Sequence, residues 1–322
     1  MKHRFVLVDV FADRPLAGNP LAVFPEGESI PEEVLQGVAR EMDHAATAFL
    51  FPSALPGALF RLRIFSRERE LGFAGHPALG AHFVYATENR LPLEEPVTRV
   101  AHEGREGLFH VELLVEEGRI GMLRLRQRPP KIGPRLPPED VVRVAKALGL
   151  EEEALQATNQ PIRVASTGLP SLIVPVATLD ALGRAAPRYG ALREVAAPLD
   201  ATIVYVFTKE TRDARAAAHA RAFDTVGASE IPGAGAAAGA LAAYLVSQAA
   251  VPISPVTSLV IEQGHALSRP SSLYVEVHVG AEDLSKPAKR ETADGTGSRL
   301  STIREVILGG RVIPVGEGVL EF

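Results

Sequence analysis

The chain has 322 residues, of which 46% are hydrophobic and 23% charged, enough to bury a core and to build two domains of ordinary size. Its net charge of −5 is spread without blocks, so we expect no nucleic acid or membrane partner. The absence of cysteine excludes disulfides, thiolate metal sites and cysteine nucleophiles. No apolar run approaches the ~20 residues of a membrane span, and no signal-peptide pattern opens the sequence. These features predict a soluble, cytoplasmic protein.

The first 70 residues predict several strands and one amphipathic helix. Residues 5–11 and 21–24 are apolar runs separated by turn-forming residues, which is typical of a hairpin. Apolar side chains recur at helical spacing within residues 29–43. Residues 46–51 and 60–65 then return to strand-like patterns.

A glycine-rich corner follows at Gly75-His76-Pro77, immediately before an apolar helical pattern that runs to about Thr87. Proline is tolerated in the first helical turn, where its missing N–H costs nothing. The preceding glycine allows a ligand to approach the backbone closely. Because the free amides and the dipole of a helix N-terminus favour negative charge, this corner suits a bound carboxylate.

A second corner repeats the arrangement around Gly233 and Gly235, before a small-residue helix that reaches about Gln248. Gly75 and Gly235 are 160 positions apart in a chain of 322 residues. This offset is close to half the chain, as a duplicated domain would give. The alternative is that both corners are ordinary glycine-rich turns before packed helices.

Five prolines in residues 128–138 predict an extended linker and a domain boundary. We therefore expect domains at 1–128 and 139–322, and the last strand is the one segment that could return to the first domain. A short helix is expected over 139–148, followed by strands and helices in irregular alternation. Irregular alternation indicates an α+β fold and not a regular βαβ repeat.

No zinc helix signature, Walker loop or nucleophile elbow is present, so the sequence favours chemistry without a metal or cofactor. Residues 294–298 resemble a phosphate loop superficially, but no helical pattern follows them, which favours a flexible hairpin loop. His76 is the most informative ionisable residue. At a helix N-terminus a histidine is driven toward its neutral form and can serve as hydrogen-bond donor or base. The alternative is a structural histidine bonded to nearby backbone.

Several motifs together resemble the PhzF-type isomerases of phenazine biosynthesis, and the resemblance runs nearly from end to end. They are Asp9-Val10-Phe11-Ala12, Gly18 to Phe24, Ala39 to Met42, Arg63 to Ser66, Phe73 to Pro77, Gln263-Gly264 and Arg269-Pro270-Ser271. The resemblance implies a diaminopimelate-epimerase-like fold of two pseudo-symmetric α/β domains, each a barrel-like sheet around a central helix, with the active site between them. It also implies a homodimer and a cofactor-independent proton shift in a small carboxylic acid, whose carboxylate is held by Gly75, His76, Gly235 and Ala236.

The chain departs from the family pattern where the resemblance places acid/base groups. Ala46 stands at the position of the family's catalytic glutamate, and Ile231 at that of its aspartate. One hypothesis is an isomerase or epimerase whose proton transfer is reassigned, with His76 retained and His44, Asp43 or Glu230 as substitutes. The alternative is a catalytically silent relative that binds a small carboxylate or serves as a structural or regulatory dimer.

Overall fold

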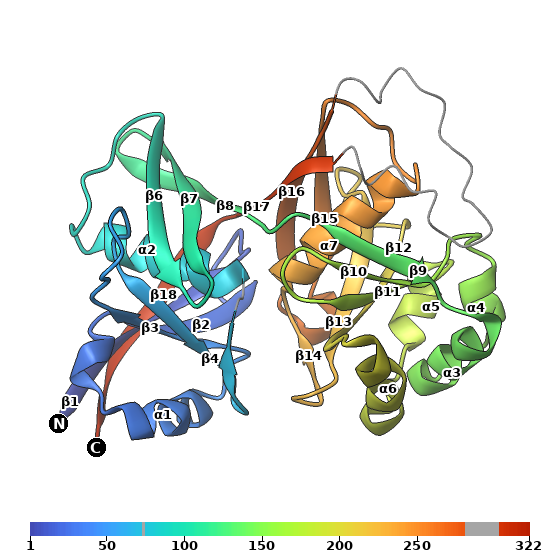
Figure 1. The fold of residues 1–322 in the computed structure, drawn as a ribbon, viewed down its shortest axis with the longest axis horizontal. Helices are drawn as coiled ribbons and strands as arrows, with labels where there is room; N and C mark the ends of the chain where they lie inside the picture. Colours follow the sequence, from blue (N-terminus) through green and yellow to red (C-terminus); the bar gives the residue numbers. More distant parts are fainter. Residues whose placement is uncertain (73–74, 281–302) are drawn as a thin grey trace. The chain divides into compact units, whose positions relative to one another are not determined.

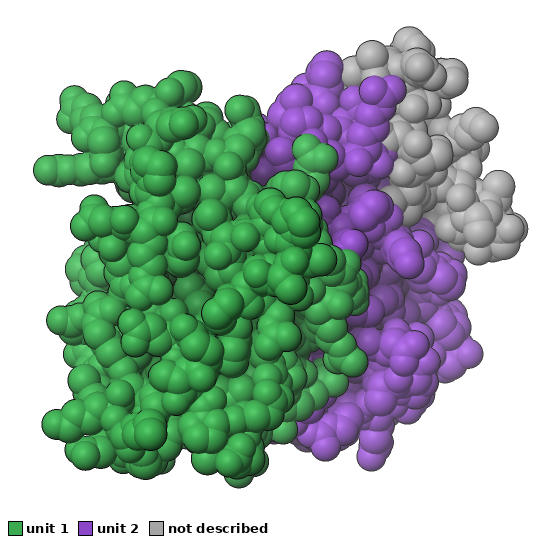
Figure 2. Space-filling view, turned by 60° about the vertical axis from the view of Figure 1, so that its left-hand side comes forward, with its two compact units in different colours: residues 1–126, 269–272, 309–322 green, residues 127–268, 273–308 purple. Residues whose placement is uncertain are grey.

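A computed structural model describes residues 1–72, 75–280 and 303–322. The chain divides into two compact units, coloured separately in Figure 2. Unit 1 comprises residues 1–126, 269–272 and 309–322, and unit 2 comprises residues 127–268 and 273–308. Both chain termini therefore belong to unit 1, where the amide of Phe322 donates to the carbonyl of Met1 at 3.2 Å.

Unit 1 packs its strands around one buried helix (Figure 1). Its strands are β1 (Lys2–Val10), β2 (Asn19–Phe24), β3 (Thr47–Phe51), β4 (Arg61–Phe65), β5 (Glu70–Leu71), β6 (Val97–Gly104), β7 (Gly107–Glu116), β8 (Arg119–Arg126) and β18 (Val312–Glu321). Its helices are α1 (Leu35–Met42) and α2 (Gly75–Thr87), with short 3-10 turns at Gly27–Ser29 and Glu32–Val34. α2 contacts β1, β2, β3, β4, β8 and β18, and every residue from Gly75 to Val84 is buried.

Unit 2 is built in the same way around α7 (Gly235–Ser247), all of whose residues are buried. Its strands are β9 (Lys131–Arg135), β10 (Arg163–Ser166), β11 (Ser171–Pro175), β12 (Ile203–Thr208), β13 (Ala218–Asp224), β14 (Ser229–Ile231), β15 (Val256–Gln263), β16 (Ser271–Val279) and β17 (Ile303–Gly310). The first two residues of β16 and the last two of β17 belong to unit 1. Its other helices are α3 (Pro138–Leu148), α4 (Glu153–Gln156), α5 (Leu179–Arg184) and α6 (Tyr189–Ala196), with 3-10 turns at Ala197–Leu199 and His265–Leu267. The small residues of α7 allow this packing, because a Cβ on Gly239 would lie 1.7 Å from Oε1 of Gln127.

The same five strand pairings occur in the same order in each unit. In unit 1, β1–β2 is antiparallel, β2–β3 parallel, β3–β4 and β4–β5 antiparallel, and β4–β6 parallel. In unit 2, β10–β11 is antiparallel, β11–β12 parallel, β12–β13 and β13–β14 antiparallel, and β13–β15 parallel. In each unit the buried helix follows the short strand of the fourth pairing: α2 follows β5, and α7 follows β14. The expected duplication within an α+β fold is therefore confirmed.

The proline-rich stretch 128–138 is not the extended linker predicted from its composition. Residues Lys131 to Arg135 form β9, which pairs with β10 inside unit 2, and Pro138 begins α3. Pro134 fits because it lies opposite an irregularity in that pairing, where a missing N–H breaks no ladder hydrogen bond. The loop predicted at 294–298 and residues 73–74 of the first corner lie outside the described residues. Across the described chain, no helix is long and apolar enough to span a bilayer.

Two buried histidines lie within the aromatic packing of unit 1. The rings of His82 on α2 and His102 on β6 are 5.0 Å apart, and Phe60 lies 4.8 Å from His82. Nδ1 of His82 donates to the carbonyl of Ala78 at 2.8 Å. Burial lowers the pKa of His82 to about 4, although that hydrogen bond opposes the shift, and it also holds the pKa of His102 well below its usual value. Both side chains are therefore neutral at pH 7.

These histidines predict acid sensitivity of unit 1. In the unfolded chain His82 takes up a proton near pH 6.5, but in the folded protein it does so only near pH 4. The free energy of unfolding therefore has its full value above pH 6.5 and falls as the pH drops toward 4. His82 alone contributes a loss of about 2 kcal/mol between pH 8 and pH 5. His82→Phe should reduce this loss, measured by urea unfolding at both pH values. Phe24→Leu, a control in the same unit, should lower stability equally at both; an unchanged pH dependence in His82→Phe would contradict the assignment.

Candidate functional site

The first corner places His76 at the start of α2, where it is 7% exposed. Nδ2 of Asn19 donates to Nδ1 of His76 at 3.4 Å. When Nδ1 accepts, the ring proton resides on Nε2, so that nitrogen is a donor. Nε2 of His76 is buried and has no hydrogen-bond partner within the described residues. A buried donor without an acceptor is costly, so this atom is suited to an incoming acceptor such as a carboxylate or carbonyl oxygen.

Electrostatics keeps His76 neutral. Burial lowers its pKa to about 3, and the neighbouring His44 lowers it further. Burial is also the largest cause of the lowered pKa of His44, followed by the charge of Arg269, while Asp43 and Asp9 act in the opposite direction. Two neutral imidazoles thus belong to one polar cluster of unit 1, in which His76 is buried and His44 half-buried.

Asp43 lies outside this cluster. It ends α1 in a left-handed conformation with φ of 51°, and its carboxylate pairs with Nη1 of Arg67 at 2.8 Å on the surface. Its side chain is 69% exposed. Of the two neighbouring residues named from the sequence, the structure places the half-buried His44 in the cluster with His76 and leaves Asp43 in solvent.

Ala46 lies one residue before β3, not within it as the sequence predicted. It is completely buried, while His44 occupies the bend that joins α1 to the strand. Since His44 and Ala46 both lie before β3, the directions of their side chains are not fixed by the alternation of a regular strand. Next to Ala46, Oγ1 of Thr47 is buried and has no hydrogen-bond partner in the described part of the chain.

A partly buried ion pair holds the loop that precedes Asn19. Nη2 of Arg269 pairs with Oδ1 of Asp9 and donates to the carbonyl of Ala17 at 2.9 Å, and its Nε donates to the carbonyl of Gly18 at 2.9 Å. The other oxygen of Asp9 accepts from the amide of Leu16 at 2.7 Å. Burial raises the pKa of Asp9, and the guanidinium of Arg269 opposes that shift. One arginine and one aspartate thus fix both sides of the loop.

The loop needs this support because its backbone is unusual. Phe11, Leu16 and Gly18 have φ of 62°, 64° and 66°, a region that only glycine adopts readily. The amide of Gly18 donates to the carbonyl of Pro270, and that of Ser272 to the carbonyl of Phe11, each at 2.9 Å. Residues 269–272 therefore complete unit 1 although both flanking segments belong to unit 2. The sequence motif contained Arg269, but only the fold assigns its role.

The second corner is anchored by Gln263, which the sequence motif also contained without a role. Oε1 of Gln263 accepts from the amide of Ala234 at 3.2 Å and from the hydroxyl of Tyr205 at 2.8 Å. Its Nε2 donates to the carbonyl of Ile231 at 2.6 Å. The first carbonyl of α7, that of Gly235, accepts from Gln127 at 3.1 Å. These contacts fix the backbone of the corner and use none of the first amides of the helix.

Gly235 and Ala236 present their amides at the start of α7, which begins at Gly235 after Ala234 in a non-helical conformation. The helix cannot satisfy its own first N–H groups. Ala236 is 6% exposed, and its carbonyl accepts from Oγ1 of Thr167 at 3.1 Å. The second corner therefore offers backbone donors but, at Ala236, no side-chain donor comparable to His76.

Glu230 is held in a two-point ion pair with Arg221. Nε and Nη2 of the guanidinium contact the two carboxylate oxygens at 3.0 and 2.8 Å. Unit 1 repeats this pair, since Nε and Nη2 of Arg63 contact Glu70 at 2.7 and 2.9 Å. In each unit the glutamate stands five residues before the first glycine of the buried helix. This duplication gives Glu230 a structural role in positioning the corner.

The two units, each with strands around a buried helix, define an α+β class, the diaminopimelate-epimerase-like fold. A probable proline racemase from Agrobacterium radiobacter has this fold, with a TM-score of 0.66, 12% identity and coverage of 99% of this chain and 93% of its own. Within that class, the family model of phenazine biosynthesis-like proteins, PhzC-PhzF, matches residues 8–298. The chain belongs to this family.

Individual relatives agree with the family assignment. The chain is 30% identical to the trans-2,3-dihydro-3-hydroxyanthranilate isomerase of Pseudomonas aeruginosa over 283 residues, which cover 88% of this chain and 93% of the relative. A crystal structure of a predicted epimerase from the same organism is 31% identical, has a TM-score of 0.76 and covers 99% of each chain. A Bacillus anthracis protein of the PhzF family shares the fold over the full length of both chains, with a TM-score of 0.83 and 23% identity.

We predict that the Asp9–Arg269 pair holds the loop before Asn19 in place. Arg269→Gln should lower the free energy of unfolding by about 3 kcal/mol, because it leaves the carboxylate of Asp9 buried without its counter-charge. Hydrogen exchange of the Leu16 and Gly18 amides should accelerate, since both hydrogen bonds belong to this network.

Arg311→Gln serves as the matched control for this variant. Arg311 pairs with Asp13 at 3.8 Å, and both side chains are more than half exposed. An exposed pair of this kind contributes less than ~1 kcal/mol, so little change is expected. Unchanged amide exchange at Leu16 and Gly18 in Arg269→Gln would show that other contacts hold the loop.

Proposed function

We propose that the protein is a cofactor-independent isomerase or epimerase that moves a proton within a small carboxylic acid. The observation that carries this proposal is the buried Nε2 of His76, a donor without a partner in the described chain, at the N-terminus of a buried helix. Such a donor, beside free backbone amides, stabilises negative charge that develops on a substrate oxygen during proton abstraction. Membership of the PhzC-PhzF family supports the same reaction class.

The proton carrier in this proposal is His44. Its lowered pKa leaves it neutral near pH 7, and a neutral imidazole can accept a proton from carbon when it lies within reach of the substrate. Glu230 is a poorer substitute, because both of its carboxylate oxygens are bound by Arg221. Asp43 is occupied by Arg67 at the surface. Ala46 and Ile231, which stand at the family's carboxylate positions in the resemblance, have no group that transfers protons.

The substrate class follows from the relatives and from the corners. Three relatives are named as isomerases of trans-2,3-dihydro-3-hydroxyanthranilate, a small carboxylic acid. Backbone amides at a helix N-terminus suit a carboxylate whatever the remainder of the molecule. We extend the proposal to a homodimer in the cytoplasm, as expected from the resemblance and from the composition.

A second function rests on the same residues. Because alanine and isoleucine cannot transfer protons, the chain can be a silent relative that binds a small carboxylate without converting it. Both functions require the corners to bind an anion, and they differ in whether the bound molecule exchanges a carbon-bound proton.

Carboxylate binding is the first test. We expect small aromatic and amino carboxylic acids to bind through the amides around Gly75-His76 and Gly235-Ala236, because this attraction depends on backbone and not on the substituted side chains. Calorimetric titration of the wild type and of Gly235→Pro measures it, with circular dichroism to verify folding. His76→Gln should also weaken binding, about tenfold for one lost hydrogen bond to a charged group. Binding unchanged in both variants would contradict the role of the corners.

Proton exchange separates the two functions. With trans-2,3-dihydro-3-hydroxyanthranilate in heavy water, followed by NMR, an enzyme that uses His44 should incorporate deuterium, and His44→Ala should slow this by about 10²–10⁴. A silent relative should show no exchange in either form. In both cases Ala46→Glu with Ile231→Asp should raise the rate, because a carboxylate near the substrate carbon can carry the proton.

The restored variant needs a control for shape and folding, since Ala46 is completely buried. Ala46→Gln with Ile231→Asn has nearly the same shape but cannot transfer protons. We expect exchange to rise only in the carboxylate variant when both have native circular dichroism. Equal rates in the two folded variants would contradict the placement of the family carboxylates at Ala46 and Ile231.

A further inference from the structure

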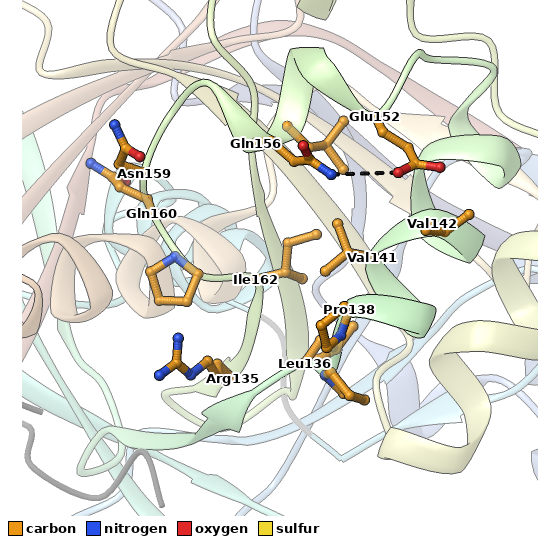
Figure 3. A pocket seen from close by; sticks show the side chains of 13 residues that line it. Arg135, Leu136, Pro138, Val141, Val142, Glu152, Gln156, Asn159, Gln160 and Ile162 are labelled. Atoms are coloured by element: carbon orange, nitrogen blue, oxygen red, sulfur yellow. Dashed lines mark hydrogen bonds between the residues drawn. The ribbon is translucent and has the colours of Figure 1, made fainter. Parts of the chain in front are cut away.

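Unit 2 contains a hollow of about 730 Å³ that none of the chemistry above uses. It lies where β9 leads into α3 and where α4 and the turn after it lead into β10 (Figure 3). Its volume is within the range of ordinary small-molecule sites, about 300–1,000 Å³. It is formed entirely by residues 135–162, so it belongs to unit 2 alone.

The floor of the hollow is apolar and rigid. Leu136, Leu155 and Ile162 are 7%, 3% and 4% exposed and belong to the hydrophobic core of unit 2. Figure 3 shows Val141 and Ile162 in the middle of the hollow, with polar side chains placed around them. Since core side chains support this surface from below, it is preformed and favours a flat or extended apolar body.

One end of the hollow is cationic. Arg135 lines it and is exposed, and its guanidinium has no ion pair within the described residues. Arg135 lies directly opposite Arg163 in the pairing of β9 with β10, and like charges in that relation repel. Burial lowers the pKa of Arg163 and Arg135 lowers it further, which reflects the same repulsion.

The rim supplies amide groups. Gln156, Asn159 and Gln160 border the hollow (Figure 3). Oε1 of Gln160 is buried and has no hydrogen-bond partner among the residues described. Its backbone is fixed, because the amide of Gln160 donates to Oγ1 of Thr158 at 3.1 Å.

We propose that this hollow binds a small amphipathic monocarboxylate, with its apolar body on Leu155 and Ile162 and its carboxylate at Arg135. The unpaired arginine selects for the negative charge, and the preformed floor selects for the apolar body. The site is separate from both glycine corners, so it offers a place for a carboxylic acid to bind without being converted. This inference does not depend on the proposed isomerase activity.

The test uses biphenyl-4-carboxylate and its uncharged carboxamide as probes, with the intact protein. Isoleucine δ-methyl groups are labelled with ¹³C, and the signals of Ile162 and Ile231 are assigned from Ile162→Val and Ile231→Val. Ile162 reports on the hollow and Ile231 on the second corner. The carboxylate should shift the Ile162 signal saturably, and the carboxamide should bind about tenfold more weakly because it lacks the charge.

Variants on the rim complete the test. Arg135→Gln should weaken binding of the carboxylate about tenfold and make the two probes equivalent, while Arg119→Gln, an exposed arginine of unit 1, should change nothing. Gln156→Trp, at an exposed position on α4, should block the hollow and abolish the Ile162 shift. The proposal is overturned if the carboxylate shifts no signal, if it shifts only Ile231, or if the carboxamide binds the wild type equally well. Loss of proton-exchange activity with binding retained would overturn the proposed function alone.

Discussion

A helix that is buried from its first residue needs partners for its ends, and both units of this protein are built around such a helix. α2 and α7 are enclosed by strands, so their first amides are hidden from bulk water and cannot be satisfied within the helix. The chain fixes the approach to each helix with a two-point arginine–glutamate pair, Arg63–Glu70 and Arg221–Glu230. What remains at each helix start is a set of fixed donors, which is the physical basis of an anion site.

The two starts are not chemically equivalent. His76 adds a buried imidazole donor to the first, and Asn19 sets its tautomer by donating to Nδ1. At the second start the corresponding place is held by Ala236. Gln263 holds the backbone there through two hydrogen bonds and accepts a third from the hydroxyl of Tyr205. The corner of unit 1 therefore has a side-chain donor beside its backbone amides, whereas the corner of unit 2 has backbone donors. In the proposed function, alanine and isoleucine at positions 46 and 231 cannot carry a proton, and this role passes to the histidines of unit 1.

Residues 263–272 contribute to both units in one short stretch of sequence. Gln263 anchors the second corner, and six residues later Arg269 binds Asp9 and the loop before Asn19. A substitution in this stretch would therefore disturb either corner without touching the residues that contact substrate in the proposal. Such residues position a site, and their role differs from that of residues that act on a substrate.

The sequence by itself determined the duplication, the positions of both buried helices and the family, because these depend on local signals: glycine and proline before an apolar run, and an offset of half the chain. It misjudged residues 128–138, since proline counts cannot show that Pro134 lies opposite an irregularity in a strand pairing. Only the tertiary structure showed that His44 lies near His76 while Asp43 is exposed, and that Glu230 is paired with Arg221. It also joined Asp9 to Arg269 across 260 residues. These outcomes depend on which distant groups meet and how deeply they are buried, and no local pattern in the sequence contains that information.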